Sequence, residues 1–592
     1  MWPREWRKTT WETLNHQQWD ILIIGGGITG AGILREATRL GLRALLVEQR
    51  DFAWGTSSRS SKLVHGGLRY LKEGQLGLTF ASVQEREQLL AEGPGLIDPL
   101  GFLLATYEGD TSRLVYRAGL TVYDLLALQW SHKYYAPEDF QLLAPHLSPS
   151  GLKGGFRYGD AQTDDARLVL RVIQEAMADG GVAMNYTRVE SLLRGEDGRV
   201  CGAVVRDVET GQTTNVQARV VINATGAWAD RLRQELGHEA KIRPLRGSHL
   251  VFPGWRLPVA QAISFMHPLD HRPVFILPWE GVTLVGTTDV DHKRPLDEEP
   301  AITPEEVAYL MAAVTVQFPS LELTLNDIIA TYAGVRPVIG SGKADPSEES
   351  RDHVVWEEDG LLTVTGGKLT TFRLIALDAL KAVHSHLPEM PAPNKDMPVL
   401  NPVNVILSGA ETVPEATRQR LLGRYGAEAV ALVAAAAPGE LMPVPGTRVL
   451  WAELRWAARA EAVVHLDDLL LRRVRLGLLQ PEGGKALLPR IREICQPELG
   501  WDDGRWEEEV RRYLALWQRS YSLPPKELIP DWREMVQAKR VQRESAVLRS
   551  YPSRRSQRLV AAGILGGTAV ILAWLYWNGR YRKSPANTMK QT

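Results

Sequence analysis

The chain has 592 residues, which is too long for one ordinary domain and predicts two to four. Its 69 lysine and arginine residues nearly balance its 70 aspartate and glutamate residues, so no overall positive field indicates a nucleic-acid partner. With only Cys201 and Cys495, the chain has neither the pattern of a disulfide framework nor that of a metal cluster. We therefore expect no metal site and a reducing, cytosol-facing compartment.

Residues 1–18 form an N-terminal extension that lacks the apolar core of a signal peptide. Aromatic and basic side chains are mixed in it: Trp2, Trp6, Trp11, Arg4, Arg7 and Lys8. We expect the tryptophans to pack on the first domain, because the stretch is short and its spacing irregular. An amphipathic contact with a membrane surface is the alternative.

A strand, a glycine turn, a helix and a second strand open the first large domain. Residues 20–24 are an apolar run typical of a buried parallel strand, and the turn of residues 25–32 follows at once. A helix is predicted from about residue 28 to residue 40, and a strand from residue 43 to residue 48. This βαβ unit predicts a dinucleotide-binding domain.

The glycine spacing Gly-x-Gly-x-x-Gly has a physical reason at each position. Gly25 permits the tight turn, Gly27 lets backbone N–H groups approach a pyrophosphate, and Gly30 lets the helix pack close to the strand. The helix N-terminus then faces the anion. Glu48 closes the second strand, where an acid is expected to hydrogen-bond an adenosine ribose. The motif by itself does not distinguish NAD from FAD.

A polar run follows Glu48 in place of a second helix and makes this distinction. Residues 55–62 offer hydroxyl groups, backbone N–H groups and cations, and residues 63–71 continue as Leu-Val-His-Gly-Gly-Leu-Arg-Tyr-Leu. We interpret the stretch as a loop that lies along the cofactor and delivers His65, Arg69 and Tyr70 toward its reactive ring.

Three later stretches indicate ligand contacts. Residues 331–337 place Arg336 in a loop framed by glycine and proline, where a guanidinium can clamp a phosphate. Residues 361–373 predict a strand, a double glycine and the start of a helix, so that free N–H groups and Lys368 would stabilise an oxygen of a reduced flavin. Residues 220–226 form an apolar strand that ends in small residues, which suits either a close ligand or an ordinary turn.

The remaining patterns predict the frame around these stretches. Residues 242–253 and 273–288 are expected to form strands of a mixed sheet that covers the cofactor domain. Within the second range, residues 274–277 and 282–286 are expected to pair as a hairpin. Asp164 or Asp165 is expected to cap a helix over residues 166–178. Residues 401–521 predict a helical cap domain without evident catalytic residues, in which Asp468 and Arg472 pair.

A polar linker, residues 522–558, leads to a predicted transmembrane helix over residues 559–577 and a tail, residues 578–592. The segment carries no charge, and as a helix it would span about 28 Å, close to the hydrocarbon thickness of a bilayer. Trp574, Tyr576 and Trp577 at one end are typical of an interfacial belt.

The flanks of this segment bear on its orientation. Seven basic residues precede it from Lys539 onward and four follow it, which favours a catalytic body on the cytoplasmic side of an inner or cytoplasmic membrane. Gly563 and Gly567 have the spacing of a helix-dimer motif and favour a homodimer.

In order along the chain, the motifs resemble those of the FAD-dependent glycerol-3-phosphate dehydrogenases of the aerobic, quinone-linked type. The resemblance runs from about residue 19 to residue 520 and is most specific over residues 57–71. It also includes Asn223-Ala-Thr-Gly226, Gly247-Ser-His249, Gly286-Thr-Thr-Asp289, Gly334-Val-Arg336 and Gly366-Gly-Lys-Leu-Thr-Thr371. It implies an α/β fold in which a glutathione-reductase-type FAD-binding domain and a mixed-sheet substrate domain are interleaved over residues 19–400, followed by an all-α C-terminal domain.

The resemblance implies oxidation of sn-glycerol 3-phosphate to dihydroxyacetone phosphate, with hydride passing from carbon 2 to flavin N5 and electrons to a membrane quinone. His65 is the first candidate for the base and His249 the second. Arg336 and Lys368 join His65 as catalytic candidates, and the substrate-binding candidates are Arg69, Tyr70, His249, Arg336 and Lys368. The cofactor-binding candidates are Gly25, Gly27, Gly30, Glu48, Thr56, Ser57, Ser58, Ser61, Lys62, Leu63, His65, Gly66, Gly67, Thr225, Gly226, Gly367, Lys368, Leu369 and Thr370.

Three other interpretations stay open. An amine or amino-acid oxidase of the same fold group needs one cation for its carboxylate, so convergence of Arg69 and Arg336 beside the flavin would favour a phosphate instead. A glycerol-3-phosphate oxidase would pass its electrons to dioxygen. A tail-anchored flavoprotein that serves as a scaffold or electron relay would contain FAD without reacting with a glycerol phosphate.

Overall fold

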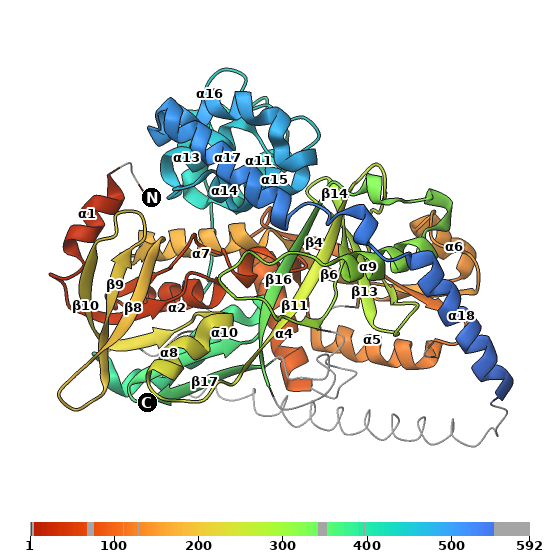
Figure 1. Ribbon diagram of the computed structural model, residues 1–592, viewed down its shortest axis with the longest axis horizontal. Coiled ribbons are helices and arrows are strands. Elements are labelled where there is room, and N and C mark those ends of the chain that lie inside the picture. The colour runs from red at the N-terminus through yellow and green to blue at the C-terminus, as the bar shows by residue number, and fades with distance from the viewer. Residues whose placement is uncertain are drawn as a thin grey trace, which may run out of the picture. The chain divides into compact units, whose positions relative to one another are not determined.

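The computed structural model describes residues 2, 5–67, 76–110, 112–127, 130–340, 352–389, 391, 394 and 397–549. The chain divides into two units, residues 1–532 and residues 533–592. The first unit contains the cofactor domain, the mixed-sheet domain and the C-terminal helical domain (Figure 1). Helix α18 lies almost entirely in the second unit.

The predicted βαβ unit lies at the centre of a largely parallel sheet (Figure 1). The strand order is β17-β18-β10-β1-β2-β7, and only β17 runs antiparallel to its neighbour on this path. The strands span His353–Glu358, Leu361–Gly366, Thr213–Asn223, Trp19–Ile24, Ala44–Val47 and Val182–Met184 in that order. Strands β8 (Thr187–Arg194) and β9 (Val200–Asp207) extend β10 as the expected antiparallel meander.

Three helices cover one face of this sheet, and the antiparallel meander packs against the other. Helix α2 (Ile28–Arg39) packs between α7 (Asp165–Ala178) and α10 (Phe372–Ala382). Every residue of β1 is buried, as expected for a central parallel strand covered on both faces. Asp164 caps α7 by accepting from the Arg167 amide at 3.3 Å, which confirms the predicted cap.

A second, mixed sheet has the order β15-β11-β14-β13-β12-β4-β6-β3, with β16 on β11 and β5 on β6. The pairing is antiparallel except between β12 and β4. The strands are β3 (Leu63–Val64), β4 (Ile97–Tyr107), β5 (Lys133–Tyr135), β6 (Leu152–Thr163), β11 (Ile242–Pro253), β12 (Ala262–Met266), β13 (Pro273–Trp279), β14 (Val282–Gly286), β15 (Val290–Asp291) and β16 (Ala330–Ile339). Helices α4 (Leu76–Glu92), α5 (Arg113–Ala127), α6 (Pro137–Leu143) and α9 (Pro304–Gln317) accompany this sheet. The prediction of a mixed-sheet domain is confirmed.

One local prediction in this sheet is wrong. The loop expected over residues 331–337 is the body of β16, which pairs with β11 from Ile339 back to Ala330. Gly334 marks a close approach of chains and not a turn, because a Cβ atom there would lie 2.7 Å from the carbonyl oxygen of Arg59. Arg336 therefore sits on a rigid strand.

The C-terminal domain is helical as predicted, and it groups above the two sheets in blue and cyan in Figure 1. Its helices are α11 (Glu415–Tyr425), α12 (Ala429–Ala435), α13 (Trp451–Ala460), α14 (Leu466–Asp468), the π-helix η9 (Leu469–Arg473), α15 (Leu476–Leu479), α16 (Leu488–Leu499) and α17 (Asp503–Ser520). Asp468 and Arg472 form the predicted ion pair at 2.5 Å, but both are buried. This pair belongs to an internal network and not to a solvated helix face.

The N-terminal tryptophans follow the packing interpretation. Trp2 is 2% exposed, its ring centroid lies 5.4 Å from that of Phe52, and its indole N–H donates to the carbonyl of Ala183 at 3.2 Å. Trp6, in helix α1 (Trp6–Thr13), packs partly buried against the same core. The extension is thus part of the first domain.

The predicted polar linker is in part a helix, α18 (Trp532–Arg549). In the part of the chain that the structure describes, no helix combines the length and the apolar character needed to cross a bilayer. The transmembrane helix predicted for residues 559–577 and the tail after it lie outside the described residues.

Candidate active site

The carboxyl ends of four parallel strands meet at one edge of the first sheet. Ile24 of β1 lies in register with Asn223 of β10 and Val47 of β2, and Asn223 lies in register with Thr363 of β18. The Gly25 turn follows β1 and Glu48 follows β2. The turns at Asn223 and Gly366 follow β10 and β18. In open α/β sheets this crevice is where ligands bind.

The glycine turn provides an anion-binding helix terminus. Gly25 adopts φ +116°, and a Cβ atom on Gly30 would lie 1.9 Å from the carbonyl oxygen of Gly25. Helix α2 begins after Gly27, which has no side chain to cap it, and the Ile28 amide donates to the Ser57 hydroxyl oxygen at 3.0 Å. A pyrophosphate fits such a terminus, because the N–H groups and the helix dipole both favour negative charge.

Glu48 is held at the end of β2 beside this turn. Its carboxylate accepts from the Gly26 amide at 2.7 Å and from the Arg50 amide at 2.9 Å. Burial raises the pKa of Glu48 and these two donors oppose the rise. A carboxylate in this position fits the adenosine ribose that the sequence predicts for it.

The cofactor loop, which we define as residues 49–67, crosses from the first sheet to the second. Thr56 donates its hydroxyl to the carbonyl of Val335 in β16, which places this part of the loop against the strand that bears Arg336. Ser58 is buried, and Ser61 places its hydroxyl oxygen 2.9 Å from Nε2 of His249. Leu63 then enters the second sheet in β3.

The side chain of Lys62, a predicted cofactor-binding residue, is anchored by buried contacts. Its ammonium is fully buried and contacts the Asp165 carboxylate at 2.8 Å and the Ser58 carbonyl at 2.6 Å. Its amide donates to Ser60 Oγ, and its carbonyl accepts from Thr163. Burial and Arg475 lower the pKa of Lys62 to about 7, although Asp165 opposes the shift. Since a buried ammonium needs its counter-ion, Lys62 supports the loop through these contacts.

The far end of the cofactor loop meets the Gly366 turn. The His65 amide donates to the Thr370 hydroxyl oxygen at 3.1 Å, and that hydroxyl donates to the His65 carbonyl at 3.2 Å. Lys368 precedes the short 3-10 helix η6 (Leu369–Thr371), and Gly367 before it adopts φ +79°. This contact brings His65 next to residues 368–370, which the sequence also predicts to bind the cofactor.

Four further cofactor candidates complete the same edge. Thr225 donates its hydroxyl to the Asn223 side chain at 2.7 Å, and the Gly226 carbonyl accepts from Thr365 at 3.2 Å. Gly66 donates its amide to Asp160 at 3.1 Å, and a Cβ atom on Gly66 would lie 2.3 Å from the Tyr123 hydroxyl oxygen. Gly67 adopts φ +78°. Arg69 and Tyr70 lie outside the described residues.

His249 is buried between the loop and the second sheet. Its ring stacks on Tyr332 with centroids 4.5 Å apart and planes 9° apart. Gly286 accommodates the other side of the ring, because a Cβ atom there would lie 2.2 Å from His249 Cδ2. Burial, then the charges of Arg336 and Lys62, hold the pKa of His249 well below its usual value. The imidazole is therefore neutral at neutral pH.

Arg336 shares a buried carboxylate with a second arginine that the sequence did not single out. Its Nη1 contacts Asp289 Oδ1 at 2.9 Å, and Arg272 Nη2 contacts the other oxygen, Oδ2, at 2.9 Å. Thr287 Oγ1 lies 3.2 Å from Nη2 of Arg336. The two partly exposed guanidinium groups therefore share one buried carboxylate. No sequence spacing links Arg272 to Arg336, so only the fold could reveal this pair.

The fold and the turn geometry define a dinucleotide-binding protein, and a family match identifies its class as the FAD-dependent oxidoreductases. The family model for FAD-dependent oxidoreductases matches residues 20–373, and the model for the C-terminal domain of alpha-glycerophosphate oxidase matches residues 398–506. The chain is 36% identical over 533 residues to the glycerol-3-phosphate dehydrogenase of Mycobacterium leprae, covering 86% of this chain and 90% of that protein. It is 40% identical over 401 residues to the aerobic glycerol-3-phosphate dehydrogenase of Bacillus subtilis, covering 65% and 71%.

A solved structure agrees with these matches. The glycerol-3-phosphate dehydrogenase from Bacillus halodurans complexed with FAD superposes with a TM-score of 0.71 at 28% identity, covering 87% of this chain and 98% of that chain. The chain belongs to the family of FAD-dependent glycerol-3-phosphate dehydrogenases. FAD is its cofactor, and the glycine turn, Glu48 and the cofactor loop fit it.

Gly30→Ala tests the seat of the cofactor. The added methyl group would overlap the Gly25 carbonyl, so α2 must shift, and we expect the flavin content of the purified protein to fall at least about fivefold. The measurement is the ratio of flavin to protein absorbance. Gly77→Ala, where nothing lies within 4 Å, is the matched control. Full flavin content in Gly30→Ala would contradict the assigned role of the turn.

Proposed function

We propose that the chain oxidises sn-glycerol 3-phosphate to dihydroxyacetone phosphate. The observation that carries the proposal is the pair of guanidinium groups on Asp289, those of Arg336 in β16 and Arg272 directly before β13, beside the cofactor loop. A phosphate dianion needs such fixed cations. The names of the relatives in Mycobacterium leprae and Bacillus subtilis support the same substrate.

The chemistry requires a base for the substrate hydroxyl and cations for its phosphate. FAD, when bound, accepts the hydride from carbon 2. The low pKa of His249 makes its imidazole a weak base, so we assign it to hydrogen bonding through Ser61 and keep His65 as the first candidate for the base. We assign Lys368, directly before η6, to stabilising an anionic oxygen of the reduced flavin with its positive charge.

Arg336 is oriented before substrate arrives. Asp289 is 5% exposed and binds Arg336 and Arg272 through different oxygens, so neither guanidinium turns without breaking a buried contact. Preorganisation of this kind lowers the cost of ordering the side chain on binding. This supports a site for a dianion more strongly than a site for an amino-acid carboxylate, for which one cation suffices.

A membrane quinone is our proposed electron acceptor. The uncharged segment of residues 559–577 would anchor the enzyme where such an acceptor is concentrated, with the catalytic body on the cytoplasmic side of the inner or cytoplasmic membrane. Helices α4 and α5 contact each other and expose Phe80, Leu114 and Leu125, which supports a surface that approaches lipid. Two copies would associate through Gly563 and Gly567.

Anaerobic mixing with sn-glycerol 3-phosphate tests the reaction. We expect the visible absorbance of the oxidised flavin to bleach in proportion to the substrate added. The opposite enantiomer and glycine serve as controls that should leave the spectrum unchanged. Absence of bleaching with the sn-3 enantiomer, in protein that contains FAD, would overturn the proposed activity.

Arg336→Ala tests the phosphate contact. We expect KM for the substrate to rise about a hundredfold with FAD content unchanged, because a charge-assisted contact with the phosphate is lost. Arg256→Ala is the matched control, since Arg256 pairs with Asp327 at 2.7 Å in another part of the sheet domain. Equal KM values for the two variants would remove Arg336 from the substrate site.

Truncation after Pro552 tests the anchor. The shortened enzyme should leave the membrane fraction for the soluble fraction and keep its rate with a water-soluble electron acceptor. Its rate with membrane quinone should fall at least about tenfold, because the enzyme is no longer concentrated at the bilayer. Retention of the truncated enzyme in salt-washed membranes would contradict a single C-terminal anchor.

A further inference from the structure

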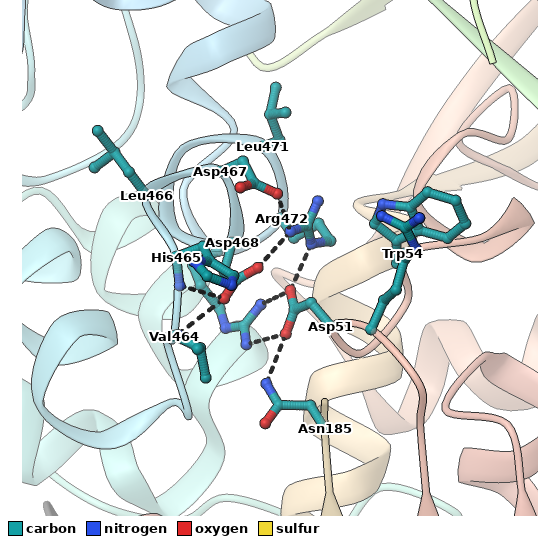
Figure 2. A network of polar contacts seen from close by, with 12 residues as sticks. Asp51, Trp54, Asn185, Val464, His465, Leu466, Asp467, Asp468, Leu471 and Arg472 are labelled. Carbon is teal, nitrogen blue, oxygen red and sulfur yellow. Dashed lines mark hydrogen bonds and ion pairs between the residues drawn. The ribbon is translucent and has the colours of Figure 1, made fainter. Parts of the chain in front are cut away.

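Three arginines from one turn of the C-terminal domain enter the cofactor domain. Arg472 and Arg473 end the π-helix η9, and Arg475 follows at φ 61°. None of the three is more than 2% exposed. Figure 2 shows Arg472 reaching from the C-terminal helices, beside Asp467 and Asp468, to Asp51 at the start of the cofactor loop.

The first contact fixes the beginning of the cofactor loop. Arg473 donates to both oxygens of Asp51, at 2.6 and 2.7 Å, and Arg472 donates to one of them through Nε. Asn185 donates to the same carboxylate at 3.1 Å. Two residues further on, the Ala53 amide donates to the Gly26 carbonyl at 2.9 Å. The arginines therefore bind the segment that lies directly on the glycine turn.

The second contact fixes the middle of the loop. Arg475 donates to the Ser58 carbonyl at 3.0 Å and forms an ion pair with Asp165. Asp165 in turn accepts from the Ser60 amide at 2.9 Å and from Lys62 at 2.8 Å. Ser58 lies next to Ser57, whose hydroxyl caps α2 where the pyrophosphate is expected.

The loop has little regular structure and is held mainly by side-chain contacts. Between Glu48 and His65 its regular structure is the 3-10 turn η1 (Thr56–Ser58) and the two-residue strand β3. Bidentate contacts between arginine and carboxylate are directional. Loss of the arginine leaves a buried carboxylate without its counter-ion, which strongly destabilises the folded protein. Docking of the C-terminal domain therefore adds buried, directional contacts at two points of the loop.

We propose that the C-terminal helical domain controls FAD binding through Arg473 and Arg475, so that FAD affinity and docking of this domain are thermodynamically coupled. The proposal goes beyond the proposed function and does not depend on the substrate. By linkage the coupling is reciprocal: the docked domain strengthens FAD binding, and bound FAD strengthens docking to the same degree. Arg473 and Arg475 are positioning residues, because they act on the cofactor through Asp51, Ser58 and Asp165.

The first test is the dissociation constant of FAD for the apoprotein of Arg473→Gln and Arg475→Gln, measured by quenching of flavin fluorescence. We expect an increase of at least about tenfold in each variant. Arg455→Gln is the matched control: Arg455 binds Glu440 and Glu498, both at 2.6 Å, within the C-terminal domain. Arg455→Gln should lower the thermal midpoint of unfolding about as much as Arg473→Gln and Arg475→Gln do, but it should leave the dissociation constant of FAD within about twofold of the wild-type value.

The second test uses the unaltered full-length protein, so it does not depend on whether the variants fold. Hydrogen exchange of residues 469–479 is followed with and without FAD, and we expect FAD to slow exchange there at least about tenfold relative to residues 488–499 of α16. Equal exchange with and without FAD would overturn the proposal. So would wild-type FAD affinity in folded Arg473→Gln and Arg475→Gln.

Discussion

The close approach of the backbone at the glycine turn is the constraint on which the rest of the structure depends. The carbonyl of Gly25 occupies the space where any side chain on Gly30 would begin, so helix α2 starts directly on strand β1. This contact aims the first amides of α2 into the crevice and sets where the pyrophosphate lies. The neighbouring strands must end at the same edge of the sheet, so that Asn223, Glu48 and Lys368 lie near the pyrophosphate and the rest of the cofactor.

The cofactor loop solves a different physical problem. A long segment without regular structure has many backbone groups to satisfy and much conformational entropy to lose. Here side-chain contacts hold it: Asp165 binds Ser60 and Lys62, Asp51 binds Arg473, and Thr56 donates to the Val335 carbonyl. The arginines of the C-terminal domain complete these contacts, which explains why a domain without evident catalytic residues has a place in a flavoenzyme.

Local patterns predicted the parts whose structure depends on neighbours in sequence. The βαβ unit, the hairpin after Pro273, the cap at Asp164 and the helical C-terminal domain follow from periodicity, glycine spacing and capping chemistry. Gly334 was misinterpreted because glycine serves both turns and close chain contacts, and only the partner, Arg59, decides between them. The ion pair of Lys62 with Asp165 could not be predicted, because the two residues are far apart in sequence.

The sequence by itself determined the cofactor fold and most of the residues at its edge, because a nucleotide pyrophosphate imposes a fixed local spacing of glycines, a helix terminus and an acid. The tertiary structure alone decided how the charged side chains are used. Arg336 is oriented by Asp289 and Arg272, and Asp51 by Arg473, through contacts between segments far apart in the chain. Buried charges require partners, and which partner comes within reach is a property of the packed fold and not of sequence spacing.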